Sequence, residues 1–297
     1  MPRLPRHISR PDDLVTSRVQ IRKGFLRQAL EKTRGVTPYV AEARRLSKAV
    51  HTVKNVEDLL QMPALGNHLI SAAGFSLKAK SHLSKNELDS AIEHVLEEVK
   101  SQTQDDFREE IVYRYLLTQG DALGGRMRNI TGAVAGIRFA EALIAALKKK
   151  TIDAEVNQAN SGKFRRIAWS NRSLVFDRKP KFIDKNIDCI LLDTDSETKK
   201  ETQLLEVRES YLACGELKGG IDPAGADEHW KTATRALSRI REAFSSRRPA
   251  LFFVGAAIEV AMAKEIFMQL SKGHLSHAAN LTRPEQLADL ADWLVQL

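Results

Sequence analysis

The chain has 297 residues and a formal net charge of +8 at pH 7, and 43% of its residues are hydrophobic. This composition is typical of a soluble globular protein, and no apolar run approaches the roughly 20 residues that a transmembrane helix needs. The first residues also lack the apolar core of a signal peptide, so we expect a cytoplasmic protein.

The excess basic charge is concentrated near the N-terminus. Residues 1–50 carry twelve Lys/Arg and four Asp/Glu, which accounts for the whole net charge, while the remainder is balanced. Such a segment favours an anionic partner such as nucleic acid. A solvated basic face without a partner is the alternative.

The first half of the chain predicts a helical region. Residues 1–12 indicate an arm without regular structure, and the glycine and proline at 35–38 are expected to interrupt the helical pattern that follows. Ser84 and Glu87 form a capping box at the start of a later helix. The predicted helices cover about 12–34, 39–50, 55–62, 64–77, 84–101, 104–118 and 131–150.

Residues 118–129 are expected to separate the last two of these helices. Two adjacent glycines precede Arg126 and Arg128, so backbone and guanidinium groups there are able to approach a phosphate. The stretch is neither a P-loop nor a dinucleotide-binding fingerprint. A plain turn between helices is an equal interpretation.

The second half of the chain predicts a mixed sheet flanked by helices. Strands are expected at about 164–169, 173–176, 187–193, 211–217, 250–255 and 277–281, and helices at 223–245, 258–272 and 284–296. This order indicates an α/β fold with a mixed sheet. We expect a mostly helical region over residues 1–150 and a catalytic core over residues 151–297.

Two carboxylates and one ammonium group are predicted to meet at the ends of two neighbouring strands. Asp188 opens one apolar strand, and Glu216 and Lys218 close the next one. Side chains two apart in a strand share a face, so Glu216 and Lys218 point the same way. Carboxylates are suitable ligands for Mg²⁺, and a nearby lysine is suited to a phosphate or an attacking water. The pattern indicates metal-dependent phosphodiester chemistry; a structural Glu216–Lys218 salt bridge is the alternative.

His229 is a further candidate for acid–base chemistry. It follows Lys218 closely and lies in a helix that Pro223 is expected to open, with Asp222 as its N-cap. An imidazole there is able to hold or deprotonate a water, or it simply contacts a neighbouring residue. We interpret the two cysteines as small buried hydrophobic residues. We expect His274 and His277 to be surface residues.

One long motif resembles a known family. Residues 215–231 read Gly-Glu-Leu-Lys-Gly-Gly-Ile-Asp-Pro-Ala-Gly-Ala-Asp-Glu-His-Trp-Lys. This stretch closely resembles the catalytic region of the AvaI/BsoBI type II restriction endonucleases of the PD-(D/E)xK superfamily. The segment that ends at Asp188 and its spacing to Glu216 are similar too. Ile187 stands where the superfamily name has a proline, which leaves the metal ligand unchanged.

The resemblance implies a homodimeric enzyme that encloses duplex DNA, with a helical region beside a PD-(D/E)xK core. Asp188, Glu216 and the Leu217 carbonyl would bind Mg²⁺. Lys218 would orient the water and stabilise the charge that develops on the phosphorus, and His229 would assist in activating the water.

The resemblance also implies a DNA sequence. Family enzymes cut C/YCGRG and leave 5′ overhangs, and a cognate DNA methyltransferase is expected in the same cell. Lys185 and Asp222 lie inside the matching motifs, and their chemistry suits guanine O6/N7 and cytosine N4 in the major groove. Arg126 and Arg128 are further candidates for DNA contact. A structure-specific or repair nuclease and a catalytically silent DNA-binding protein are the alternatives.

Overall fold

The computed structural model describes residues 3–53, 55–194, 201–244 and 248–297, with the side chains of residues 128–131 left out. The chain forms two compact units. Met1–Leu26 and Asn129–Leu297 form the sheet unit, and Arg27–Arg128 form the helical unit. This division differs from the expected boundary at residue 150, because residues at both ends of the N-terminal half pack with the sheet.

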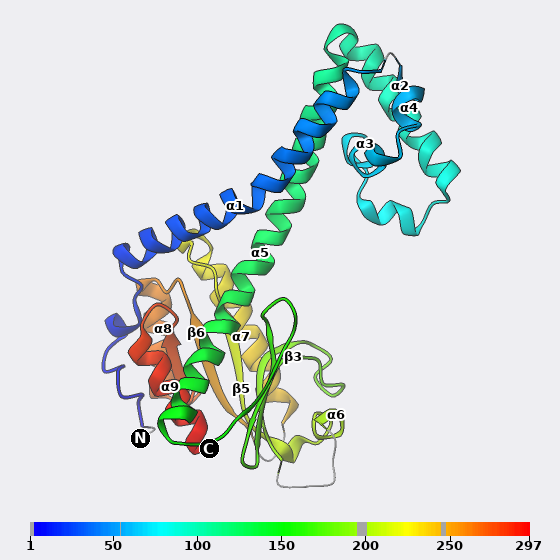
Figure 1. Cartoon of the computed structure of the whole chain (residues 1–297). Helices are drawn as coiled ribbons and strands as arrows, with labels where there is room; N and C mark the ends of the chain where they lie inside the picture. The colour runs from blue at the N-terminus through cyan, green and yellow to red at the C-terminus, as the bar shows by residue number, and fades with distance from the viewer. Residues whose placement is uncertain (1–2, 54, 195–200, 245–247) are drawn as a thin grey trace. The chain divides into compact units, whose positions relative to one another are not determined.

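The sheet unit is built on seven strands that lie in the sheet in their order along the chain. Neighbours from β1 to β5 are antiparallel, and β5, β6 and β7 are parallel (Figure 1). All six predicted strands are present, whereas β1 was missed because it is exposed along its whole length and has no apolar pattern. The strands are β1 (Glu155–Gln158), β2 (Phe164–Trp169), β3 (Arg172–Arg178), β4 (Ile187–Asp193), β5 (Tyr211–Lys218), β6 (Ala250–Gly255) and β7 (His277–Asn280).

Helices cover both faces of this sheet. α7 (Ala226–Ala243) and α8 (Val260–Ser271) make the parallel crossovers after β5 and β6, and their apolar residues join one hydrophobic cluster. The C-terminal part of α5 (Phe107–Lys149) and α9 (Pro284–Gln296) contribute to a second cluster. The mixed α/β fold predicted from the sequence is therefore confirmed, with the core in two layers on either side of the sheet.

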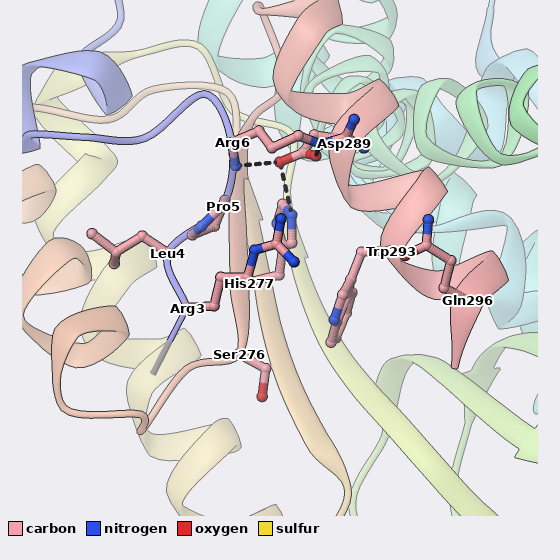
Figure 2. Close-up of a pocket in the computed structure, with 9 residues that line it drawn as sticks. All are labelled: Arg3, Leu4, Pro5, Arg6, Ser276, His277, Asp289, Trp293 and Gln296. Atoms are coloured by element: carbon pink, nitrogen blue, oxygen red, sulfur yellow. Dashed lines mark hydrogen bonds and ion pairs between the residues drawn. The ribbon is translucent and has the colours of Figure 1, made fainter. Parts of the chain in front are cut away.

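The N-terminal arm, expected to lack regular structure, is ordered against the C-terminal elements. Ile8 and Leu14 are fully buried, and η1 (Pro11–Leu14) forms a turn of 3₁₀ helix. Asp289 of α9 accepts hydrogen bonds from the backbone N of Arg6 at 2.8 Å and from its Nε at 2.7 Å. Figure 2 shows the same carboxylate reaching the imidazole of His277, whose Nε2 lies 3.3 Å away. These contacts hold the N-terminal arm against β7 and α9.

The helical unit has a hydrophobic core of its own. It contains the later part of α1 (Arg18–Val50) and the first part of α5. The predicted capping box is present, since Ser84 N donates to Glu87 Oε2 at 2.8 Å. The shorter helices of this unit are α2 (Val56–Leu60), α3 (Gly66–Ala72), α4 (Lys85–Thr103), η2 (Pro63–Leu65), η3 (Leu77–Ser81) and η4 (Gln104–Asp106). In the sheet unit, short helices are α6 (Glu201–Leu204), η5 (Arg208–Ser210) and η6 (Pro223–Gly225).

Two predicted helix breaks are wrong. α1 runs through residues 35–38 with Pro38 inside it, and α5 runs through residues 118–129. Residues 118–129 are therefore a stretch of helix and form neither a phosphate-binding loop nor a plain turn, the two interpretations of the sequence. An interior proline costs about 3 kcal/mol and a glycine about 1 kcal/mol. Packing between the helices offsets this cost: Leu123 is buried, and the Arg126 guanidinium lies 5.7 Å from the centre of the Tyr39 ring.

One apolar helical stretch was not identified from the sequence. Among the described residues, one segment, residues 85–149, holds a stretch long and apolar enough to cross a membrane by length and composition alone. At its C-terminal end, Phe139, Leu143 and Leu147 of α5 are fully buried in the second cluster of the sheet unit. A core helix has this same pattern.

Candidate active site

The ends of β4 and β5 bring three of the predicted site residues together. The two strands are antiparallel, and Cys189 pairs with Gly215, so Asp188 at the start of β4 lies beside Glu216 near the end of β5. Asp188 Oδ2 accepts a hydrogen bond of 2.7 Å from the backbone N of Leu217. This bond holds the carboxylate against the neighbouring strand.

Lys218 lies close to both carboxylates. Its Nζ is 3.0 Å from Glu216 Oε2 and 3.7 Å from Asp188 Oδ2. The Glu216–Lys218 salt bridge that was considered as an alternative is therefore present, but it is only part of a cluster with two acids and one base. The cluster carries one excess negative charge when all three groups are ionised.

Burial strengthens the electrostatic interactions in this cluster. Glu216 is 4% exposed, and burial together with the charge of Asp188 raises the pKa of its carboxyl to about 7. Burial by itself lowers the pKa of Lys218, but the charges of Glu216 and Asp188 outweigh it and the pKa is raised. Lys218 therefore stays charged, while Glu216 is held near the point of protonation.

These residues fit a magnesium ion. Within the described part of the chain, no group of three or more His, Cys, Asp or Glu side chains is arranged to hold a metal. Mg²⁺ does not need such a group, because it keeps several waters and binds through one or two carboxylates. A cation beside Glu216 would also relieve the repulsion from Asp188 that helps to raise its pKa. The donor set is thus compatible with Asp188, Glu216 and the Leu217 carbonyl as ligands.

Asp177 is a third acid near the cluster that the sequence analysis missed. Phe176 pairs with Cys189 and Arg178 with Ile187, so Asp177 of β3 stands across from Asp188. Its φ of 52° interrupts the extended backbone at this point. Burial and the charge of Asp188 raise the pKa of the Asp177 carboxyl. Its only signal in the sequence is an acid directly after a buried strand.

His229 lies in the first turn of α7, because this helix begins at Ala226 after η6. Its side chain is exposed, and its Nε2 faces the backbone at Gly220, two residues after Lys218. The loop that leaves β5 and the start of α7 therefore bring this imidazole back towards the end of the strand.

The candidates for DNA contact lie at different places in the chain. Lys185 is exposed in the loop before β4, and Asp222 is exposed with its Oδ1 accepting a 3.0 Å hydrogen bond from Ala224 N. Asp222 thus caps η6, as predicted for a helix beginning at Pro223. Arg126 is exposed on α5 in the helical unit, and the side chain of Arg128 lies outside the described residues.

The remaining cysteine and histidine predictions have mixed outcomes. Cys189 and Cys214 are fully buried free thiols in different hydrophobic clusters, as predicted, and burial raises the pKa of both. The prediction for His277 is wrong, since it is 3% exposed between Asp289 and Trp293. His274 is exposed, as predicted.

Comparison with known proteins assigns the family. The model of the restriction endonuclease BsobI family matches residues 4–165 and 148–297. The chain is 43% identical to the type II restriction enzyme AvaI of Nostoc sp. and of Anabaena variabilis, over 98% of each chain. It is 38% identical to the type II restriction enzyme BsoBI of Geobacillus stearothermophilus, over 98% of this chain and 97% of that one. The chain therefore belongs to the BsobI restriction endonuclease family and is a type II restriction endonuclease.

Proposed function

We propose that this enzyme is a cytoplasmic PD-(D/E)xK endonuclease that hydrolyses phosphodiester bonds in duplex DNA. The observation that carries the proposal is the cluster of Asp188, Glu216 and Lys218 at the ends of β4 and β5, with both carboxylates within 3.7 Å of the lysine Nζ. Two carboxylates that suit a metal ion, beside a charged lysine that suits a phosphate oxygen, are a combination fitted to metal-assisted phosphoryl hydrolysis. The names of the relatives, type II restriction enzymes, agree with this chemistry.

In the proposed site, Asp188, Glu216 and the Leu217 carbonyl hold Mg²⁺. The bound metal would neutralise phosphate charge and lower the pKa of a water molecule. Because burial and Asp188 raise the pKa of Glu216 to about 7, this carboxyl must lose a proton before it serves as a ligand. The hydrogen bond from Leu217 N fixes the orientation of Asp188 before any metal arrives.

Lys218 and His229 act on the water and on the developing charge. Lys218 keeps its proton, because the two carboxylates raise its pKa, so it is suited to stabilise negative charge on the phosphate oxygens. His229 has an imidazole on the loop side of the same strand end, and it would accept a proton from the attacking water. These roles divide charge stabilisation and proton transfer between two residues.

The proposed DNA site is a G·C-rich palindrome, C/YCGRG, cut to leave 5′ overhangs. A palindrome requires a two-fold homodimer in which each subunit presents the same residues to one half-site. Lys185 and Asp222 would contact guanine and cytosine edges. Arg126 and Arg128 would contact the DNA from the helical unit. A cognate methyltransferase would protect the host DNA at the same sequence.

A plasmid digest with Mg²⁺, followed by sequencing of the ends, tests the proposal. Wild-type enzyme should give discrete fragments ending at CYCGRG. Lys218→Ala should lose about 10²–10³ in cleavage rate, as other single charge-stabilising groups do. Lys100→Ala is the control, since Lys100 forms a partly exposed pair with Glu97 at 3.3 Å in the helical unit.

The outcomes separate the proposal from its alternatives. Cleavage only at flaps, junctions or nicks would assign a structure-specific nuclease instead. DNA binding without cleavage under any divalent cation would assign a silent DNA-binding protein. Discrete fragments with other ends would contradict the recognition sequence and leave the nuclease proposal standing.

A further inference from the structure

Gly220 lies in the loop between β5 and η6, in contact with His229. A Cβ atom at position 220 would lie 3.0 Å from His229 Nε2 and 3.4 Å from its Cδ2. Distances of 3.0–3.4 Å are shorter than about nine in ten contacts of real Cβ atoms, so the imidazole would have to move by a few tenths of an ångström to make room. The imidazole therefore lies close to the place that the Cβ atom of any other residue at position 220 would take.

Backbone conformation does not explain the glycine at this position. Among the described residues, the glycines with positive φ are Gly74, Gly162 and Gly273. An alanine at position 220 is thus compatible with the backbone, and its cost comes from the side chain alone. Gly225 provides a comparison on the same imidazole, because a Cβ there would lie 3.5 Å and 3.7 Å from Nε2 and Cδ2, which are ordinary contact distances.

The loop side of this contact has little freedom to move. Ile221, the next residue, is 3% exposed, and its side chain packs directly against Gly24 of α1. Before the loop, the Lys218 carbonyl accepts a 2.8 Å hydrogen bond from Ala256 N. After it, Asp222 caps η6. The loop is held on both sides of Gly220.

The helix backbone on the other side is held as well. Trp230, which follows His229, is 2% exposed, and its Nε1 donates a 2.6 Å hydrogen bond to Glu265. The exposed imidazole of His229 is the part of this contact that is free to rotate. A methyl group at position 220 would therefore displace the imidazole and leave both backbones in place.

We infer that Gly220 is a positioning residue for the reaction, which keeps the His229 imidazole close to the end of β5. The inference rests on the proposed role of His229 in activating water. A general base must stay within hydrogen-bond reach of the proton that it accepts, so a small displacement reduces its contribution. The loss caused by Gly220→Ala is bounded by the loss in His229→Ala, for which about 10²–10⁴ is typical.

A double-mutant cycle tests this inference. Single-turnover cleavage rates at saturating enzyme are measured for the wild type, Gly220→Ala, His229→Ala and the double variant, with Gly225→Ala as the matched control. Because a misplacement of about 1 Å costs about 10²-fold in rate, we expect the smaller shift in Gly220→Ala to slow cleavage by about threefold to tenfold at unchanged DNA affinity. Gly225→Ala should stay within about twofold of the wild type, because its methyl group only makes ordinary contacts. In the His229→Ala background, Gly220→Ala should have no further effect.

Two further measurements separate displacement of the ring from general damage to the fold. The NMR signals of the His229 ring in the full, metal-free chain, assigned with His229→Ala, should shift in Gly220→Ala and stay in place in Gly225→Ala. If Gly220→Ala lowers the melting temperature, removal of the imidazole in the double variant should restore it, because the methyl group then has space.

The outcomes distinguish the inference from the proposed function. A normal cleavage rate for Gly220→Ala together with a slow His229→Ala would overturn the inference and leave the role of His229 intact. An equal slowing by Gly220→Ala in the presence and absence of the imidazole would also overturn it. A wild-type rate for His229→Ala would instead refute the proposed role of His229, and with it a catalytic reason for the glycine.

Discussion

Replacing the buried acid of the site should stabilise the metal-free protein while it abolishes cleavage. Glu216 is 4% exposed and lies beside a second carboxylate, and burial and Asp188 raise its pKa from 4.5 to about 7. Glu216→Gln removes one negative charge and keeps an oxygen that is able to accept the hydrogen bond from Lys218. The Asp188–Lys218 pair then remains as a neutral pair.

The magnitude follows from the pKa of Glu216. Between pH 4.5 and about 7 the folded protein binds more protons than the unfolded chain, so its stability falls as the pH rises through this window. Each pH unit corresponds to about 1.4 kcal/mol, so the full cost is about 3 kcal/mol above pH 7 and is absent below pH 4.5. Glu216→Gln should recover about 1–3 kcal/mol at pH 8, because some of the hydrogen bonding from Lys218 is weakened.

Denaturant unfolding in EDTA at pH 8 and at pH 4.5 measures this effect. The variant should be more stable than the wild type at pH 8, and the difference should disappear at pH 4.5. Addition of Mg²⁺ at pH 8 should stabilise the wild type and have less effect on the variant, since a ligand is missing. A variant that is less stable than the wild type at pH 8 would refute the reasoning about repulsion in the cluster.

Three further predictions concern specificity, DNA affinity and the N-terminal arm. Asp222→Asn keeps an oxygen that is able to cap η6, but it should lose about 1–3 kcal/mol of discrimination at one base pair. Cleavage of DNA sites with single base substitutions measures this loss, and unchanged discrimination would show that Asp222 only caps the helix. Neutralising Arg22, Lys23 and Arg27, all exposed on α1, should weaken both specific and non-specific DNA binding. The slope of the logarithm of the binding constant against the logarithm of salt concentration should become less steep by up to about 0.9 per lost phosphate contact. The same slope as in the wild type would contradict this prediction. Asp289→Asn should cost about 1–2 kcal/mol at pH 7 after allowance for solvent screening, because Arg6 and His277 outweigh burial and lower the pKa of Asp289 to about 2. The stabilisation by ionised Asp289 is complete above pH 3.8 and is lost as the pH falls towards 2. A loss of stability in Asp289→Asn that is the same at every pH in urea unfolding would contradict this prediction.

The sequence by itself determined most of the sheet unit and the candidates for its chemistry. Its strands are short apolar runs bounded by polar residues and turns, and their pattern depends on neighbours only a few residues away. Asp188, Glu216 and Lys218 were found in the same way, because each is a charged residue at the end of such a run. β1 was missed for the opposite reason, since an exposed edge strand has no apolar pattern.

The tertiary structure decided the features that depend on residues far apart in the chain. α1 and α5 continue through predicted breaks because they pack against other helices, and that packing outweighs the cost of Pro38 and of the glycines. The N-terminal arm is ordered by contacts with residues far along the chain, such as the hydrogen bond from Arg6 to Asp289, more than 280 residues later. The raised pKa of Glu216 likewise requires Asp188 on another strand. Local sequence indicates most of the helices and strands, but the full length of α1 and α5, and the burial and charge at one site, depend on which segments the fold brings together.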